Sequence, residues 1–298
     1  MLGMINPIAF SLGPIEVHWY GVILGLASLV GLFLAIREGK KQKIDPEFFT
    51  DFMLIVLPSA LIGARAYYVI FKWDDYRNNL SEVIKIWHGG IAIYGALIGG
   101  MIAAVIYVRW KGYNFWKIAD ICAPSLLIGQ AIGRWGNFVN QEAHGGPVEK
   151  TFLSDTLHLP NLIVKEMNIN GTYFHPTFLY ESLWNLAGLA LLLIIRHRFA
   201  YRRGELFLSY FIWYSIGRFF IEGLRTDSLA FTGPVWLEKI MNALWIPMKL
   251  VFAPGQMDYG NVRVSQLLSI IIIMIAIGFI FFRRKRENSN PEEVTLGT

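Results

Sequence analysis

The sequence of 298 residues has little charge and almost no cysteine. Charged residues make up 16% of the chain, against roughly 25% in typical soluble domains, while hydrophobic residues make up 54%. The single cysteine, Cys122, excludes an intramolecular disulfide and a site built from several thiolates. The apolar content also excludes a disordered chain. This composition is typical of a membrane protein.

Common catalytic and metal-binding motifs are absent as well. The sequence contains no H-E-x-x-H, no G-x-S-x-G and no P-loop, and its six histidines show no metal-ligand spacing. We therefore expect neither a metal nor a cofactor. The net charge of +5 comes from basic residues scattered between apolar runs, so nucleic acid is not an expected partner.

Long apolar stretches predict an all-α, polytopic membrane protein with about seven transmembrane helices. Each stretch has roughly the 20 residues that cross a hydrocarbon core of about 30 Å. No lysine or arginine precedes Arg37, so the first stretch does not resemble a cleaved signal peptide. The predicted spans are 17–36, 52–71, 91–108, 118–138, 178–195, 206–224 and 264–282.

The distribution of lysine and arginine predicts the orientation. The loops after spans one, three, five and seven carry 15 basic residues, and the loops on the other side carry 8. Because cytoplasmic loops accumulate positive charge, we expect the amino terminus outside and the carboxyl terminus inside. Residues 1–282 would form one membrane domain, with a small outer head from loops 139–177 and 225–263. Residues 283–298 would form a disordered cytosolic tail.

Several arginines remain within the predicted spans, namely Arg65, Arg134 and Arg218. A charge at this depth costs about 3 kcal/mol or more and by default marks a functional site. On two spans the polar residues share one helix face, within an arc of about 80° at 100° per residue. The two faces are Gln130, Arg134, Asn137 and Gln141 on span four, and Tyr214, Arg218, Glu222 and Arg225 on and just after span six.

These faces predict an anion site near the outer leaflet. Arg218 and Glu222 can neutralise each other at i and i+4, but Arg134 and Arg65 have no acid one turn away on their own helices. Guanidinium groups bind phosphate through two donors and stay charged when desolvated, so a phospholipid head group is the expected guest. Small residues at four-residue spacing predict close helix packing that brings Arg134 near span three. These residues are Gly95 and Gly99 on span three and Gly129 and Gly133 on span four.

Six ordered motifs resemble the prolipoprotein diacylglyceryl transferase family, Lgt. The segment GQAIGRWGNFVNQEAHG is similar to the family signature G-R-x-G-N-F-x-N-x-E-x-x-G. The resemblance covers almost the whole chain except the tail and residues 229–260. The other motifs are HWYG, GAR followed by Tyr68, GGIAIYGALIG, HPTFLYE and YSIGRFFIEGLR.

The resemblance implies an enzyme of the bacterial cytoplasmic membrane. It would transfer the diacylglyceryl group of phosphatidylglycerol to the thiol of the lipobox cysteine in a prolipoprotein and release glycerol phosphate. The residues that match motif positions and would contact substrate are Tyr20, Arg65, Tyr68, Arg134, Asn137, Asn140, Glu142, Gly145, His175, Glu181, Tyr214 and Arg225, with Arg134, Arg218 and Glu222 catalytic.

One motif departs from the family pattern. Many members carry histidine in G-G-x-x-x-H-G-G-L-I-G, where this chain has Tyr94 followed by Gly95 and Ala96. His88 lies six residues too early to replace it. A tyrosine of pKa about 10 is a poor base at neutral pH, so we expect Tyr94 to act as a hydrogen-bonding group.

Two other classes of function remain open from the residues alone. An anion or lipid transporter or channel could line its path with Arg134 and Arg218. An intramembrane hydrolase would need Ser59 or Ser125 to face a histidine, and no spacing in the sequence indicates this.

Overall fold

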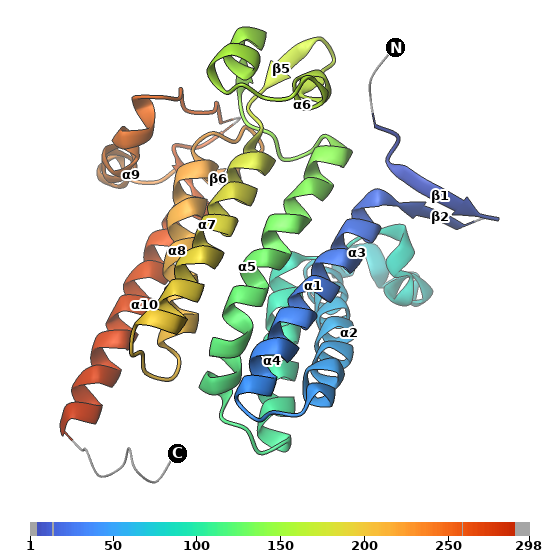
Figure 1. Cartoon of the computed structure of the whole chain (residues 1–298). Helices are drawn as coiled ribbons and strands as arrows, with labels where there is room; N and C mark the ends of the chain where they lie inside the picture. The colour runs from blue at the N-terminus through green and yellow to red at the C-terminus, as the bar shows by residue number, and fades with distance from the viewer. Residues whose placement is uncertain (1–4, 14, 258, 290–298) are drawn as a thin grey trace. The chain divides into compact units, whose positions relative to one another are not determined.

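The computed structural model describes residues 5–13, 15–257 and 259–289, and most of these are helical (Figure 1). The chain forms two compact units, one from 1–31 with 123–298 and the other from 32–122. The two units are described separately below.

Long helices lie at all seven predicted spans, with ends that differ from the expected ones by up to seven residues. Six of them are long and apolar enough to cross a bilayer, so the protein is a polytopic membrane protein. The seventh, α8, is not in this set, and it carries Glu205, Arg218 and Glu222. The seven helices are α1 (Trp19–Lys41), α2 (Pro46–Phe71), α4 (Ile93–Trp110), α5 (Phe115–Asn140), α7 (Thr177–Arg198), α8 (Glu205–Glu222) and α10 (Val264–Ser289).

The unit 32–122 is built on the close packing of α2 against α4. A Cβ added at Gly63 of α2 would lie 2.5 Å from the carbonyl oxygen of Gly95, so the two backbones nearly touch. Gly95 and Gly99 thus serve close packing as predicted, but the helix they contact is α2. Between α2 and α4 the chain forms three short helices: α3 (Trp73–Tyr76), η1 (Leu80–Ile84) and η2 (Ile86–His88).

In the other unit, α8 packs against both α7 and α10. The pairing of α8 with α10 includes a two-pronged contact in which Arg284 donates from Nε and Nη2 to the carboxylate of Glu205, at 2.6 and 2.9 Å. Helix α10 continues to Ser289, so residues 283–289 of the predicted disordered tail are helical. The rest of that tail, 290–298, lies outside the described residues.

Both predicted head segments contain short strands, so an all-α description is too simple. In 139–177 the strands β3 (Pro147–Val148), β5 (Thr172–Phe174) and β4 (Asn168–Ile169) form an antiparallel sheet in that order, with the turn η3 (Phe152–Thr156) and α6 (Asn161–Glu166) beside them in the sequence. In 225–263 the strands β6 (Ala230–Phe231) and β7 (Val262–Arg263) pair around α9 (Val235–Lys249). An antiparallel hairpin of β1 (Ile8–Leu12) and β2 (Ile15–His18) precedes α1.

Candidate functional site

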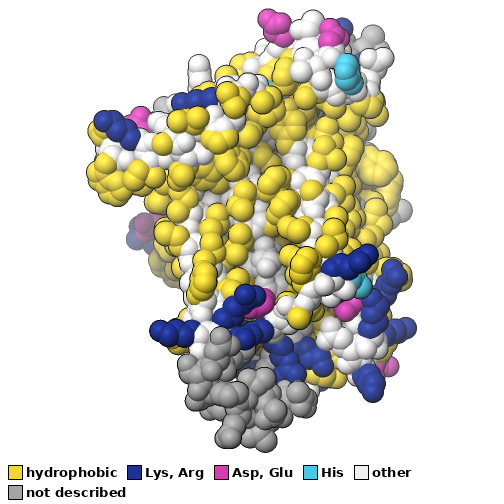
Figure 2. Space-filling view, turned by 60° about the vertical axis from the view of Figure 1, so that its left-hand side comes forward, with side chains coloured by type: hydrophobic (Ala, Val, Ile, Leu, Met, Phe, Trp, Pro, Cys, Tyr) yellow, Lys and Arg dark blue, Asp and Glu magenta, His cyan; other side chains and the backbone are white. Residues whose placement is uncertain are grey.

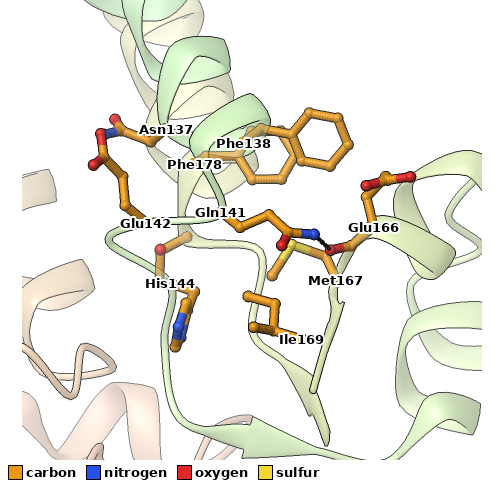
Figure 3. A pocket seen from close by; sticks show the side chains of 10 residues that line it. Asn137, Phe138, Gln141, Glu142, His144, Glu166, Met167, Ile169 and Phe178 are labelled. Carbon is orange, nitrogen blue, oxygen red and sulfur yellow. Dashed lines mark hydrogen bonds between the residues drawn. The ribbon is translucent and has the colours of Figure 1, made fainter. Parts of the chain in front are cut away.

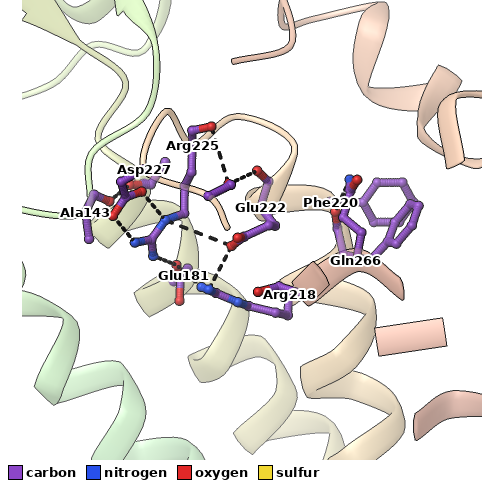
Figure 4. A network of polar contacts seen from close by, with 12 residues as sticks. Ala143, Glu181, Arg218, Phe220, Glu222, Arg225, Asp227 and Gln266 are labelled. Carbon is purple, nitrogen blue, oxygen red and sulfur yellow. Dashed lines mark hydrogen bonds and ion pairs between the residues drawn. The ribbon is translucent and has the colours of Figure 1, made fainter. Parts of the chain in front are cut away.

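Three arginines and two glutamates form a cluster near the ends of α5 and α8 and the beginning of α7. Figure 4 shows Arg218, Arg225 and the two glutamates of this cluster. Nη2 of Arg134 lies 2.5 Å from one carboxylate oxygen of Glu181. Arg218 lies 3.5 Å from the other oxygen of Glu181 and 2.7 Å from Glu222. Arg225 lies 3.8 Å from Glu181 and 4.0 Å from Glu222. The two polar faces predicted from the sequence therefore meet through Glu181 of α7.

Helix geometry explains how α8 contributes several of these groups. Arg218 and Glu222 are four residues apart, so they lie one above the other on one helix face. The helix ends at Glu222, and Gly223 follows as its C-cap. Arg225 comes just after this end and still lies beside Glu222. The last turn of α8 and the residues just after it thus place two guanidinium groups around one buried carboxylate.

The arginines differ from the glutamates in exposure. The side chains of Arg134 and Arg218 are 20% and 21% exposed, whereas those of Glu181 and Glu222 are 7% and 2% exposed. A guanidinium has five N–H donors, and the contact with Glu181 engages one terminal nitrogen of Arg134. Both arginines can therefore bind an anion on their open side while the buried carboxylates hold them in place.

A further carboxylate, Asp227, belongs to the cluster. Arg225 donates two hydrogen bonds to Asp227, at 2.9 and 2.6 Å. Burial raises the pKa of Asp227, but the bonds from Arg225 outweigh this effect and hold the pKa below its usual value. Arg134, Arg218 and Arg225 are thus balanced by the three acids Glu181, Glu222 and Asp227.

Arg263, which the sequence analysis left without a role, lies beside this cluster. It is buried in β7, and its Nη2 donates to the carbonyl of Gly255 at 2.6 Å. Its Nε has no hydrogen-bond partner among the described residues. Burial lowers the pKa of Arg263, while the charge of Glu222 works in the opposite direction. Arg263 therefore brings the fourth positive charge to a group with three acids.

The loop after α5 connects the signature segment to the rest of the cluster. The amide of Gly145 donates to the carbonyl of His175 at 3.0 Å, and Gly145 also forms a β-bridge with Arg225. A Cβ at Gly145 would lie 2.6 Å from Cβ of His175, so no larger residue fits. Thr177 donates its hydroxyl to the carbonyl of Ala143 at 2.5 Å. Gly145 thus brings three sequence motifs to one corner of the fold.

Two tryptophans join α7 and α8 next to the cluster. The indoles of Trp184 and Trp213 stack with centroids 4.3 Å apart, and each N–H donates to the other residue's backbone carbonyl, at 3.0 and 2.9 Å. Each indole covers a glycine of the opposite helix, Gly188 or Gly217, and a Cβ there would clash with the ring. Trp184 follows Glu181 by three residues, so this interlock sets the register in which Glu181 meets Arg218.

Asn137 and Glu142 line a small pocket beside the end of α5 (Figure 3). Asn137 donates Nδ2 to Glu142 at 3.0 Å, and Gln141 donates Nε2 to the carbonyl of Glu166 at 2.9 Å. The pocket has room for roughly one water molecule, so it does not accommodate a lipid. The sequence analysis did not identify Glu166, a buried acid whose Oε2 accepts the amide of Ile5 at 3.1 Å.

His175 lies in an aromatic environment outside the membrane spans. Its ring packs edge-on against Phe152 and Phe252, and its Nδ1 lies 3.2 Å from the hydroxyl of Tyr180. Burial lowers the pKa of His175 to about 4. The imidazole is therefore neutral at physiological pH and joins the head segment to the chain around Phe252.

Three other residues that were predicted to contact substrate belong to this unit. Tyr20 packs its ring over Gly136 of α5, within 2.6 Å of where a Cβ would be. Tyr214 is half-buried, and its ring lies 6.1 Å from that of Tyr210. Asn140 is exposed at the end of α5.

Arg65, in the unit 32–122, is bound by the protein's own backbone. Its guanidinium donates to the carbonyls of Val83 at 2.8 Å, Gly89 at 2.5 Å and Gly90 at 2.7 Å. It also donates to the carbonyls of Glu82 and Lys85, and it lies 5.1 Å from the centre of the Tyr76 ring. Arg65 is buried, and its surroundings indicate that it holds the connection between α2 and α4, a role that sequence reasoning did not predict.

The unit 32–122 also contains Tyr68, Tyr94 and His88. Tyr68 is packed so close to Gly90 that a Cβ there would lie 2.8 Å from the Tyr68 ring. Tyr94 is the second residue of α4 and is 46% exposed, and the centre of its ring lies 6.5 Å from the centre of the Tyr67 ring. His88 belongs to η2, before α4, and its Nδ1 lies 2.8 Å from Glu82.

Comparison with known proteins identifies the family. The family model described as prolipoprotein diacylglyceryl transferase matches residues 7–282. This chain belongs to that family. Relatives named phosphatidylglycerol--prolipoprotein diacylglyceryl transferase include proteins of Listeria monocytogenes, 51% identical over 95% of this chain and 92% of the relative, and of Bacillus velezensis, 50% identical over 95% and 93%. The relative from Geobacillus kaustophilus is 53% identical over 95% and 94%.

Among the described residues, no group of three or more His, Cys, Asp or Glu side chains is arranged to hold a metal ion.

Proposed function

We propose that this protein transfers the diacylglyceryl group of phosphatidylglycerol to the thiol of a lipobox cysteine in a bacterial prolipoprotein. The thiolate sulfur forms a bond to the glycerol carbon of the diacylglyceryl group. The bond between that carbon and the phosphate oxygen breaks, and glycerol phosphate leaves with the electron pair. The thiol proton passes to solvent or to the departing phosphate, so the charge that must be stabilised is on the leaving group.

The observation that supports this reaction best is the open side of the arginine cluster. Arg134 and Arg218 are held by buried carboxylates and keep exposed guanidinium surface. Preorganised donors of this kind stabilise a developing anion because they need not reorient during the reaction. The bound lipid phosphate is then expected to contact Arg134 and Arg218, with Asn137, Asn140, Glu142, Tyr20 and Tyr214 contributing to the substrate site.

The nucleophile belongs to the peptide substrate, so the chain needs no reactive cysteine of its own. A thiol of pKa about 8.5 is a few per cent ionised near neutral pH, and neighbouring guanidinium groups increase that fraction. The fourth positive charge of Arg263 adds to this field. A strong general base is helpful but not required, which is consistent with a tyrosine at position 94.

The same proposal includes a location and a topology. The protein would lie in the bacterial cytoplasmic membrane, with the amino terminus outside and seven spans including α8. A helix of 18 residues is about 27 Å long, which is close to the hydrocarbon thickness. The head segments 139–177 and 225–263 would then lie on the outer side, where prolipoproteins expose the lipobox.

A transfer assay with the purified full-length protein tests the reaction. The protein is mixed with phosphatidylglycerol and a lipobox peptide, and mass spectrometry measures the peptide. We expect a diacylglyceryl thioether on the cysteine and release of one glycerol phosphate for each modified peptide. An anion or lipid transporter would instead move phosphatidylglycerol or anions across vesicles without modifying the peptide, and that result would overturn the proposal.

A further inference from the structure

Helix α9 docks onto the end of α8 by one of its faces. The buried Trp245 donates its indole N–H to the carbonyl of Phe220 at 2.9 Å. Its ring lies so close to Gly223 that a Cβ there would clash with it. Met241 is buried beside it, and the same cluster includes Leu267 of α10. These contacts fix α9 at the level of the last turn of α8 and the first turn of α10.

A second face of α9 is apolar and exposed. At 100° per residue this face covers an arc of about 100°, next to the docked face. Trp236, Ile240 and Leu244 are 62%, 46% and 48% exposed, which is unusual for side chains of this size. The members of this apolar face are Trp236, Ile240, Ala243, Leu244 and Pro247.

The remaining side of α9 is mostly polar. Lys239, Asn242 and Lys249 are exposed there, together with the apolar side chains of Val235 and Ile246. Glu238 on the same side accepts a hydrogen bond from Asn261 at 2.8 Å, which ties the helix to the chain before β7. The centre of this polar side lies about 140° around the helix from the centre of the apolar face. Such a division is typical of a helix that lies in a membrane interface.

We propose that α9 binds the lipid surface of the bilayer, with its apolar face among the acyl chains and its lysines at the level of the lipid phosphates. The helix docks where α10 begins, and the lipid-facing side chains of α10, such as Leu268 and Ile271, are exposed from that point on. The apolar face of α9 therefore continues a surface that already faces lipid. Figure 2 turns this side forward. Hydrophobic side chains cover the part of the molecule that projects at the upper left and continue onto the surface below it, and Lys and Arg lie at the outer edge of the projecting part.

This placement has a consequence for the arginine cluster, and that consequence rests on the proposed function. Trp245 is seated on Gly223, the residue after Glu222. A helix held in the interface therefore keeps the end of α8, with Arg218 and Arg225, at the depth of lipid phosphate. Loss of the lipid contact should lower the rate of transfer from lipid without unfolding the protein.

Spin labels measure the depth of α9 directly. The full-length protein carries Cys122→Ala and one cysteine at position 240, 242 or 244, and is reconstituted in vesicles of phosphatidylethanolamine and phosphatidylglycerol. We expect labels at 240 and 244 to collide with oxygen, which dissolves in lipid, at least threefold more than with a water-soluble nickel chelate. The label at the matched polar position 242 should show the opposite preference.

Two outcomes would overturn the proposal. Chelate collisions at 240 and 244 that equal those at 242 mean that the face is in water. Exclusion of both reagents at 240 and 244 means that protein, such as a second copy of the chain, covers the face. Because this readout does not use enzymatic turnover, it stands or fails independently of the proposed reaction.

A pair of variants tests the consequence for activity. Leu244→Glu adds a charge to the apolar face, and Asn242→Glu adds the same charge to the polar side, at a site that is also exposed. We expect Leu244→Glu to move the label at 240 toward water and to lower transfer at least fivefold relative to Asn242→Glu. A displaced label with unchanged transfer would refute the link between α9 and the arginine cluster.

Discussion

Replacing Arg134 by alanine separates anion binding from folding, because Arg134 has few contacts in the cluster. Its contact with Glu181 engages one terminal nitrogen at 2.5 Å. Glu181 keeps Arg218 at 3.5 Å and Arg225 at 3.8 Å, so its buried charge remains compensated after the substitution. We therefore expect Arg134→Ala to insert and fold.

The expected loss of transfer activity is large, although the variant is expected to fold. A hydrogen bond between charged groups contributes about 1.5 to 3 kcal/mol, and removal of one preorganised donor for an oxyanion typically costs about 3 to 4 kcal/mol of transition-state stabilisation. At about 1.4 kcal/mol for each factor of ten, the rate of transfer should fall by roughly 100-fold or more. Arg134→Lys should recover little of it, because an ammonium is a point charge without the planar pair of donors.

The measurement is the steady-state rate of diacylglyceryl transfer to a lipobox peptide, with the melting temperature recorded for each variant. Arg218→Ala is the matched comparison. It also removes the 2.7 Å partner of Glu222, whose side chain is 2% exposed, so it should lose stability as well as activity. Near-normal turnover of Arg134→Ala would refute the role of this arginine in holding phosphate.

The remaining predictions concern other parts of the chain. Trp213→Phe replaces the indole by a smaller aromatic ring and removes the hydrogen bond to the Trp184 carbonyl, so transfer should fall several-fold with a loss of stability of about 1 kcal/mol or more; an unchanged rate would contradict a positioning role. Tyr94→Phe should lower turnover while Tyr94→His keeps a useful fraction and His88→Ala is nearly silent; a dead His88→Ala beside a fully active Tyr94→Phe would reverse the assignment. The folded pKa of His175 is about 4, below the unfolded value of about 6.5, so its contribution of about 3 kcal/mol is present above pH 6.5 and lost as the pH falls toward 4; His175→Gln should flatten this part of the stability curve, and a curve identical to wild type would be contrary evidence. A cysteine at position 290 should resist an impermeant reagent added outside intact cells, and labelling there would contradict the topology.

The positions of the long helices follow from the sequence because hydrophobic runs and basic loops are local signals. Both polar faces were also predictable, since helix periodicity alone brings Arg218 and Glu222 together. The partner of Arg134 was not, because Glu181 belongs to another helix and only packing brings the two within 2.5 Å. Sequence reasoning had matched Glu181 to a family motif without finding the contact that it makes.

Arg65 shows why a residue type at a given depth does not determine a role. A charged residue within a predicted span indicated a substrate site. In the structure its guanidinium is bound by carbonyls of residues 82–90, in the segment that connects α2 to α4. A buried carbonyl without a donor is costly, so an arginine can be retained for the needs of a loop. No pattern in the sequence around Arg65 reveals these partners.

The contacts of Gly188 and Gly217 also depend partly on a local sequence pattern and partly on tertiary packing. A Trp-x-x-x-Gly spacing occurs on both α7 and α8, at Trp184 and Gly188 and at Trp213 and Gly217. The spacing puts each tryptophan one turn from a glycine, a pattern that is visible in the sequence. That each ring covers the glycine of the opposite helix depends on the antiparallel approach of α7 and α8, which becomes evident only in the folded chain. Because the glycines leave no room for a Cβ, the two helices cannot slide past each other by a residue, and Glu181 stays opposite Arg218.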